Sequence, residues 1–73
     1  MIIVTLNRLL RYKMLTDFTD KMEKDNYKYV EKYISQQLKL KNTEIALNFV
    51  DDAIDLLEKR IQYKKEHKIK FEY

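Results

Sequence analysis

The sequence of 73 residues contains neither glycine nor proline. At average usage the two together would supply about nine residues in a chain of this length. AT-rich codon usage explains part of the deficit, because alanine is also scarce at two residues and lysine is abundant at twelve. The remainder constrains the fold, because the chain must make its turns without the residue that most easily adopts left-handed backbone. We expect asparagine and aspartate to mark the helix ends instead.

The missing residue types also exclude several classes of functional site. Without glycine there is no phosphate-cradling loop, dinucleotide fingerprint or nucleophile elbow. Without cysteine there is no disulfide, zinc finger, iron–sulfur cluster or thiol nucleophile, and the single histidine, His67, lies among lysines. The spacing of Asp51, Asp52 and Asp55 resembles the Mg²⁺-binding motif of prenyl-chain enzymes, but 73 residues cannot enclose their cavity. We therefore expect no enzyme activity, catalytic residue, cofactor, metal or small-molecule substrate.

The chain length predicts a single small helical domain covering residues 1–73. A domain of this size is marginally stable without disulfides or metals, so we expect a homodimer. No segment is long and apolar enough to span a membrane, and the charges follow the apolar start instead of preceding it as in a signal peptide. These features predict a cytoplasmic protein (host cytoplasm or virion-internal if viral). The composition is typical of a virus, plasmid or low-GC bacterium.

The first predicted helix covers residues 8–24. Apolar residues recur every four positions along it, and we expect this stripe to face the core. The stripe consists of Leu6, Leu10, Met14, Phe18 and Met22, widened by Leu9 and Leu15. Asp25-Asn26 is predicted to end this helix, because both residue types are favoured at helix ends.

A second helix is predicted over residues 27–40, with an apolar side of Tyr27, Val30, Tyr33, Ile34 and Leu38. Asn42-Thr43 predicts the next break, and Glu44 suits the positive end of the helix that follows. That third helix carries heptad-spaced apolar residues and should end near His67. We interpret this seam as the dimer core, formed by Leu47, Val50, Ile54, Leu57 and Ile61.

The two termini could form short strands. Residues 1–6 are rich in β-branched side chains, although they could equally extend the first helix. Residues 68–73 alternate apolar and charged, which is the period of a half-buried strand or of a tail that docks its aromatics on the helices. The expected fold class is therefore mainly α: a three-helix chain with possible short terminal β-strands, assembling as a homodimeric helical bundle.

Charge is segregated along the chain. Residues 1–16 carry a net charge of +3, residues 44–58 carry −5, and residues 59–73 carry +4. Six tyrosines add a residue type that is favoured at interfaces. We interpret the chain as a non-enzymatic regulatory or assembly protein that acts through protein–protein contacts, with itself and with another protein as partners.

The alternative is a small basic DNA-binding transcriptional regulator, with nucleic acid as the partner. A strand over residues 2–7 followed by two helices would resemble the element order of ribbon-helix-helix repressors, although a third long helix departs from that fold. In this interpretation Thr5 and Asn7 would contact base edges, and Arg8, Arg11 and Lys13 would neutralise phosphates. A membrane-surface role for the apolar and basic residues 1–16 ranks below both hypotheses.

Overall fold

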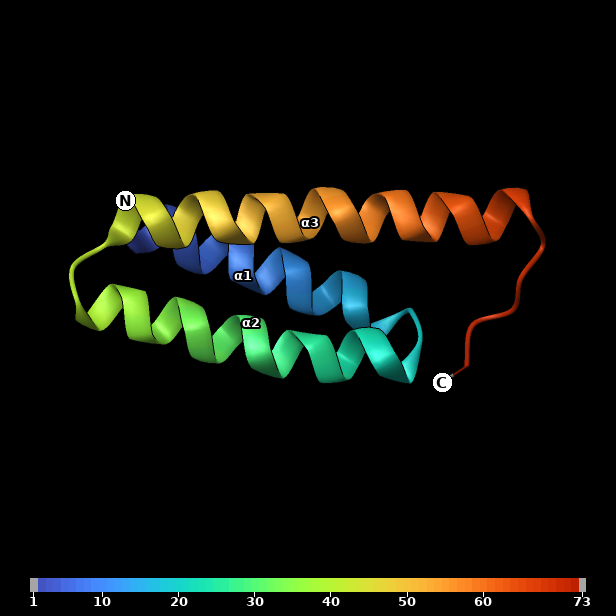
Figure 1. Ribbon diagram of the computed structural model, residues 1–73, viewed down its shortest axis with the longest axis horizontal. Coiled ribbons are helices and arrows are strands. Elements are labelled where there is room, and N and C mark those ends of the chain that lie inside the picture. The colour runs from blue at the N-terminus through green and yellow to red at the C-terminus, as the bar shows by residue number, and fades with distance from the viewer. Residues whose placement is uncertain (1, 73) are drawn as a thin grey trace.

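The protein is described here by a computed structural model, which covers residues 2–72. Its three helices are α1 (Ile2–Asp17), α2 (Lys21–Lys39) and α3 (Thr43–Glu66). α3 runs the length of the molecule, and α1 and α2 pack against it and against each other (Figure 1). α1 and α3 run in the same direction and α2 runs opposite to both. The prediction of a mainly helical three-helix chain is confirmed, whereas assembly as a homodimer is not shown.

The predicted terminal strands are wrong, since no strand is present among residues 2–72. The β-branched residues at the start continue α1, because strand propensity is weak when helical hydrogen bonds can propagate along the same segment. After α3, residues 67–72 turn back toward the α1–α2 turn (Figure 1). There the Lys21 amide donates a hydrogen bond of 2.7 Å to the Glu72 carbonyl. Met1 and Tyr73 lie outside the described residues.

The predicted break at Asp25-Asn26 is also wrong, because both residues lie inside α2. The chain turns earlier, at Phe18, Thr19 and Asp20. The Thr19 hydroxyl donates to the Thr16 carbonyl at 2.9 Å, which satisfies an acceptor at the end of α1. Asp20 has extended backbone (φ −66°, ψ 155°) at the N-cap of α2, and its carbonyl accepts the first hydrogen bonds of that helix.

The predicted break at Asn42-Thr43 and the predicted end of α3 near His67 are confirmed. The left-handed residues at these ends are lysines and not asparagines: Lys41 has a φ of 61° and Lys68 has a φ of 54°. At both ends two amides donate back to carbonyls of the last turn, Lys41 to Leu38 and Asn42 to Gln37 at the end of α2. This is the Schellman arrangement, which usually has glycine at the left-handed position.

The core lies where the three helices meet. α3 contributes Ala46, Val50, Ile54 and Leu57, α2 contributes Val30 and Ile34, and α1 contributes Leu9 and Tyr12. The buried side of α1 is partly polar, because Thr5 and Thr16 are also buried there. The predicted core stripe is wrong for the five residues at the four-residue spacing, which are all exposed, whereas Leu9 and Leu15, which widen the stripe, pack in the core. The side of α1 that packs on the other helices is the opposite one, where Thr5, Leu9, Tyr12 and Thr16 are buried.

Candidate interaction surfaces

The outward side of α1 is apolar. Five residues form this surface, which we call the α1 face: Ile3 (75% exposed), Leu6 (49%), Leu10 (56%), Met14 (56%) and Phe18 (72%). It lies opposite the buried side of the helix, because Thr5, Leu9, Tyr12 and Thr16 point into the bundle. Large contiguous apolar patches are uncommon on monomeric proteins, which makes the α1 face a candidate interaction surface.

Two of the three basic residues of α1, Arg8 and Arg11, form ion pairs with acidic residues of α3. The Arg8 guanidinium lies 3.5 Å from the Asp51 carboxylate, and the Arg11 guanidinium donates to the Glu58 carboxylate at 3.0 Å. The basic start and the acidic block, which the sequence separates by more than thirty residues, therefore meet inside one chain. These two basic residues of the first segment thus form ion pairs with the acidic segment of the same chain.

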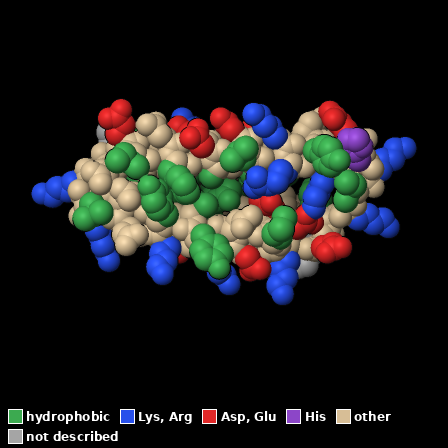
Figure 2. All heavy atoms as spheres, viewed as in Figure 1, with side chains coloured by type: hydrophobic (Ala, Val, Ile, Leu, Met, Phe, Trp, Pro, Cys, Tyr) green, Lys and Arg blue, Asp and Glu red, His purple; other side chains and the backbone are tan. Residues whose placement is uncertain are grey.

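A second apolar surface follows the seam between α2 and α3. Figure 2 shows hydrophobic side chains gathered along this seam, with lysines and arginines both around the edge and within its right half. Its exposed members include Tyr29 on α2 and Phe49 and Leu56 on α3, which line one shallow groove. The Phe49 ring stacks on Tyr33 with 4.4 Å between ring centroids. Because Asp52 and Arg60 also line the groove, this surface is more polar than the α1 face.

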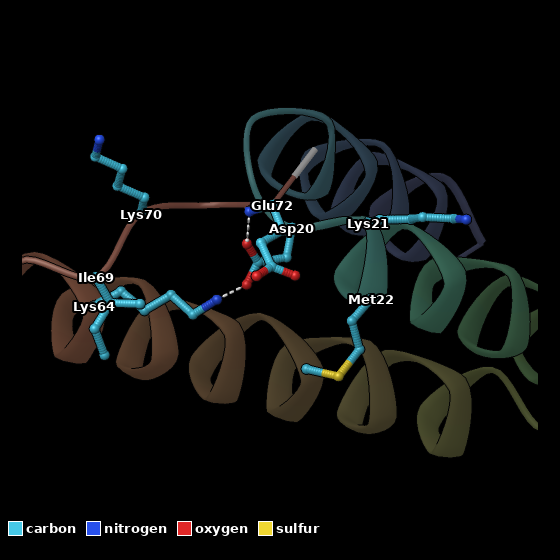
Figure 3. Close-up of a pocket in the computed structure, with 7 residues that line it drawn as sticks. All are labelled: Asp20, Lys21, Met22, Lys64, Ile69, Lys70 and Glu72. Carbon is cyan, nitrogen blue, oxygen red and sulfur yellow. Dashed lines mark hydrogen bonds and ion pairs between the residues drawn. The ribbon is translucent and has the colours of Figure 1, made fainter.

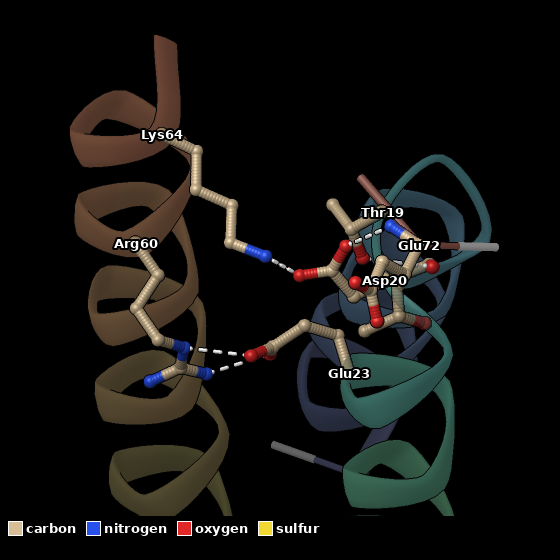
Figure 4. A network of polar contacts seen from close by, with 7 residues as sticks. Thr19, Asp20, Glu23, Arg60, Lys64 and Glu72 are labelled. Carbon is tan, nitrogen blue, oxygen red and sulfur yellow. Dashed lines mark hydrogen bonds and ion pairs between the residues drawn. The ribbon is translucent and has the colours of Figure 1, made fainter. Parts of the chain in front are cut away.

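A network of buried charges joins the start of α2 to the end of α3 (Figure 4). Arg60 donates to both carboxylate oxygens of Glu23, at 2.8 and 2.7 Å. The Glu23 side chain is only 5% exposed, whereas that of Arg60 is 42% exposed. These hydrogen bonds raise the pKa of Arg60, although burial acts against them. Burial raises the pKa of the adjacent Tyr12 phenol, and the Glu23 charge raises it further.

Asp20 ties a third segment into this network. Its carboxylate pairs with the Lys64 ammonium and accepts a hydrogen bond from the Glu72 amide (Figure 3). The neighbouring Lys21 and Lys70 side chains point away from it. In residues 2–72 every buried side-chain polar atom has a hydrogen-bond partner. The network therefore has no orphaned group aimed at a ligand, and we interpret it as structural.

The five predicted nucleic-acid contacts are not brought together on one accessible surface. Thr5 is fully buried, so its hydroxyl cannot reach a base edge in this fold. Arg8 and Arg11 form ion pairs with α3, which leaves Asn7 and Lys13 as the exposed residues of this set that are accessible to DNA.

The five predicted dimer-core residues lie inside the chain's own core. Val50, Ile54 and Leu57 are buried, and Leu47 and Ile61 are half-buried against them. Their heptad spacing is accounted for by packing on α1 and α2. Whether these residues also contribute to a dimer stays a prediction, and within one chain only Leu47 and Ile61 of the five keep part of their surface exposed.

Asp51 and His67, the other polar candidates from the sequence, each contact a neighbouring side chain. Asp51 pairs with Arg8, and the part of the chain that the structure covers holds no group of three His, Cys, Asp or Glu side chains placed to bind a metal. The His67 ring packs on Tyr63, with 4.2 Å between ring centroids. None of the helices is both long and apolar enough to cross a membrane, over the residues described.

The comparisons with known proteins give no relationship: no family model, no curated protein and no solved structure matches the chain.

Sequence analysis missed the residues of the charged network. One signal for them exists, since Asp20 followed three residues later by Glu23 has the spacing of a capping box at a helix start. The apolar residues spaced by four include Phe18 and Met22, on either side of Asp20, so this pattern predicts one continuous helix where the chain turns.

Proposed function

We propose that this protein is a non-enzymatic regulatory or assembly protein that works through protein–protein contacts as a homodimer. The α1 face carries the proposal, because it presents five large exposed apolar side chains, and Arg11 at its border donates a hydrogen bond to Glu58 of α3. Their exposed fractions together equal about three whole side chains. At about 1.5–3 kcal/mol for each fully buried apolar side chain, covering the face is worth about 5–9 kcal/mol per copy.

Association itself costs about 4–15 kcal/mol in lost freedom of motion. Covering two copies of the α1 face is worth about 10–18 kcal/mol in total, which is of the same size as that cost. We therefore propose a reversible dimer with a dissociation constant in the micromolar range, which corresponds to about −8 kcal/mol. A dimer of this strength forms and dissociates readily. That behaviour suits a regulator whose state depends on its own concentration. The α2–α3 groove then remains for another protein, since tyrosine and phenylalanine are favoured at such contacts.

Sedimentation velocity across a concentration series tests this proposal. We expect the wild-type chain to shift from monomer to dimer in the micromolar range, and Leu10→Glu to remain monomeric because it places a charge at the centre of the α1 face. Leu40→Glu is the matched control, because Leu40 is 64% exposed and lies outside α1. A wild-type chain that stays monomeric at hundreds of micromolar contradicts the proposal.

The DNA-binding alternative has weaker support, because two of its three cations are paired and Thr5 is buried. Binding to random duplex DNA at low salt separates the hypotheses. Salt-sensitive binding that Lys13→Ala weakens would favour DNA, since each lost phosphate contact reduces the salt dependence.

A further inference from the structure

We propose that two copies pair α1 against α1 in antiparallel orientation, with the two-fold axis passing at Leu10. This inference rests on the proposed function and assigns the interface and the orientation. Leu10 then meets Leu10 of the partner subunit, and Leu6 meets Met14 of the partner subunit. Asp17 lies beside the first turn of the partner's α1.

The spacing of the α1 face suits this symmetry. Leu6 and Met14 each lie four residues from Leu10, which is about 6 Å along the helix axis. A two-fold axis at Leu10 therefore brings Leu6 and the partner subunit's Met14 to the same level. Closed two-fold dimers are the commonest form of self-association, and they require a surface that is complementary to itself. The α1 face satisfies that requirement with side chains of similar size.

The charges at the two ends of α1 favour the antiparallel orientation. α1 has no acidic residue in its first turn and no basic residue in its last, and its final residue is Asp17. An acid at the negative end of a helix dipole is unfavourable, whereas the same acid near a positive end is stabilising. Antiparallel pairing moves Asp17 of each copy next to the positive end of the other α1. Parallel pairing would place the two Asp17 carboxylates together.

Arg11, which borders the α1 face, does not oppose the pairing. Its guanidinium is drawn toward α3 by the hydrogen bond to Glu58, so each copy neutralises its own cation. Lys13 is exposed on the other border, where the same register places it beside Asn7 of the partner subunit and leaves its ammonium in water.

The area available is that of a small, reversible interface. The five residues of the α1 face equal about three whole side chains. Taking about 100 Å² per side chain gives about 300 Å² of apolar surface in each copy. Interfaces are about 57% apolar, so the whole contact would bury about 500 Å² per copy, compared with about 800 Å² in a standard interface, which fits a weak dimer.

Single engineered cysteines test the orientation directly, because the chain has none of its own. With a short bismaleimide we expect Leu10→Cys to cross-link to itself. Leu6→Cys and Met14→Cys should each cross-link poorly alone and efficiently when the two variants are mixed. Ser35→Cys, exposed on α2, is the control for random collisions.

The outcomes distinguish the two proposals. Efficient self-cross-linking of both Leu6→Cys and Met14→Cys would show a parallel pair and overturn the inference while leaving the homodimer intact. A dimer that cross-links only through Leu56→Cys would place the interface on the α2–α3 groove and also overturn it. A chain that sediments as a monomer at every concentration contradicts the proposed function itself.

Substitution of Asp17 provides a second, independent measurement. Asp17→Asn should raise the dimer dissociation constant by about three- to thirty-fold, because the favourable contact is lost at both ends. The same change should not destabilise the monomer, since it removes an acid from the negative end of its own helix. Asp25→Asn, at an exposed position of α2, is the matched control and should leave the dissociation constant unchanged. Equal effects of the two variants would overturn the inference.

Discussion

Arg60→Met would leave the Glu23 carboxylate buried without its cation. Removing one member of a buried ion pair costs about 3–5 kcal/mol, because the remaining charge stays desolvated. Here the Arg60 side chain is 42% exposed, so water can partly replace it and we expect a loss of about 2–3 kcal/mol. For a domain of this size, that loss lowers the melting temperature by roughly 10–20 °C. It is a large share of the roughly 4–11 kcal/mol expected for the whole chain.

Urea and thermal unfolding, followed by far-ultraviolet circular dichroism at one protein concentration, would measure this loss. Adding Glu23→Gln to Arg60→Met should recover part of the stability, because the second change removes the unpaired charge. Arg11→Met is the matched control: its pair with Glu58 is exposed on both sides and should be worth about 0–1 kcal/mol. The reasoning fails if Arg60→Met costs no more than Arg11→Met, or if the double variant is less stable than Arg60→Met alone.

Further predictions concern the core, one tyrosine and one helix end. Leu57→Ala should cost about 2–5 kcal/mol in urea unfolding, because Leu57 is fully buried, whereas Leu40→Ala at an exposed position should stay within about 0.5 kcal/mol. Burial, followed by the hydrogen bond to Glu31, raises the pKa of Tyr27 to about 12. The fold thus favours the neutral phenol, and the associated stability is present below pH 10 and lost as the pH rises through 12. Absorbance titration against Tyr27→Phe should show this late ionisation, and Glu31→Gln should shift it to lower pH; an unchanged midpoint in Glu31→Gln would contradict the assignment. Lys41→Gly should stabilise the chain by about 0.5–1 kcal/mol in the same unfolding assay, since Lys41 holds a φ of 61°, and a loss of stability would show that the lysine side chain contributes more than the backbone cost.

The sequence predicted the second half of the fold better than the first. α3 has a regular apolar seam and a capping pair at Asn42-Thr43, so local pattern and tertiary packing agree there. In α1 they disagree, because two of the four buried positions, Thr5 and Thr16, are threonines, and the most apolar side of the helix faces outward. A hydropathy pattern assigns that side to the core. The structure shows that α2 and α3 pack on the opposite side of α1, so the core is complete without the more apolar side.

The functional candidates were also predicted only in part. The residues proposed as a dimer seam were identified correctly as apolar and periodic, but periodicity does not say whether the partner helix belongs to the same chain. The charged network escaped prediction because Glu23 and Arg60 are 37 residues apart in sequence. No local pattern links them, and the break misplaced at Asp25-Asn26 put Glu23 near the end of a helix instead of at the start of one.

The carboxylate of Asp20 depends on residues that are synthesised much later. Its partners Lys64 and Glu72 lie 44 and 52 positions further along the chain, and the partner of Glu23 lies 37 positions away. During synthesis these two acids therefore meet their native partners only after most of α3 has been made, and the contact with Glu72 forms last. We expect the α1–α2 pair alone to be less stable than the whole bundle for this reason.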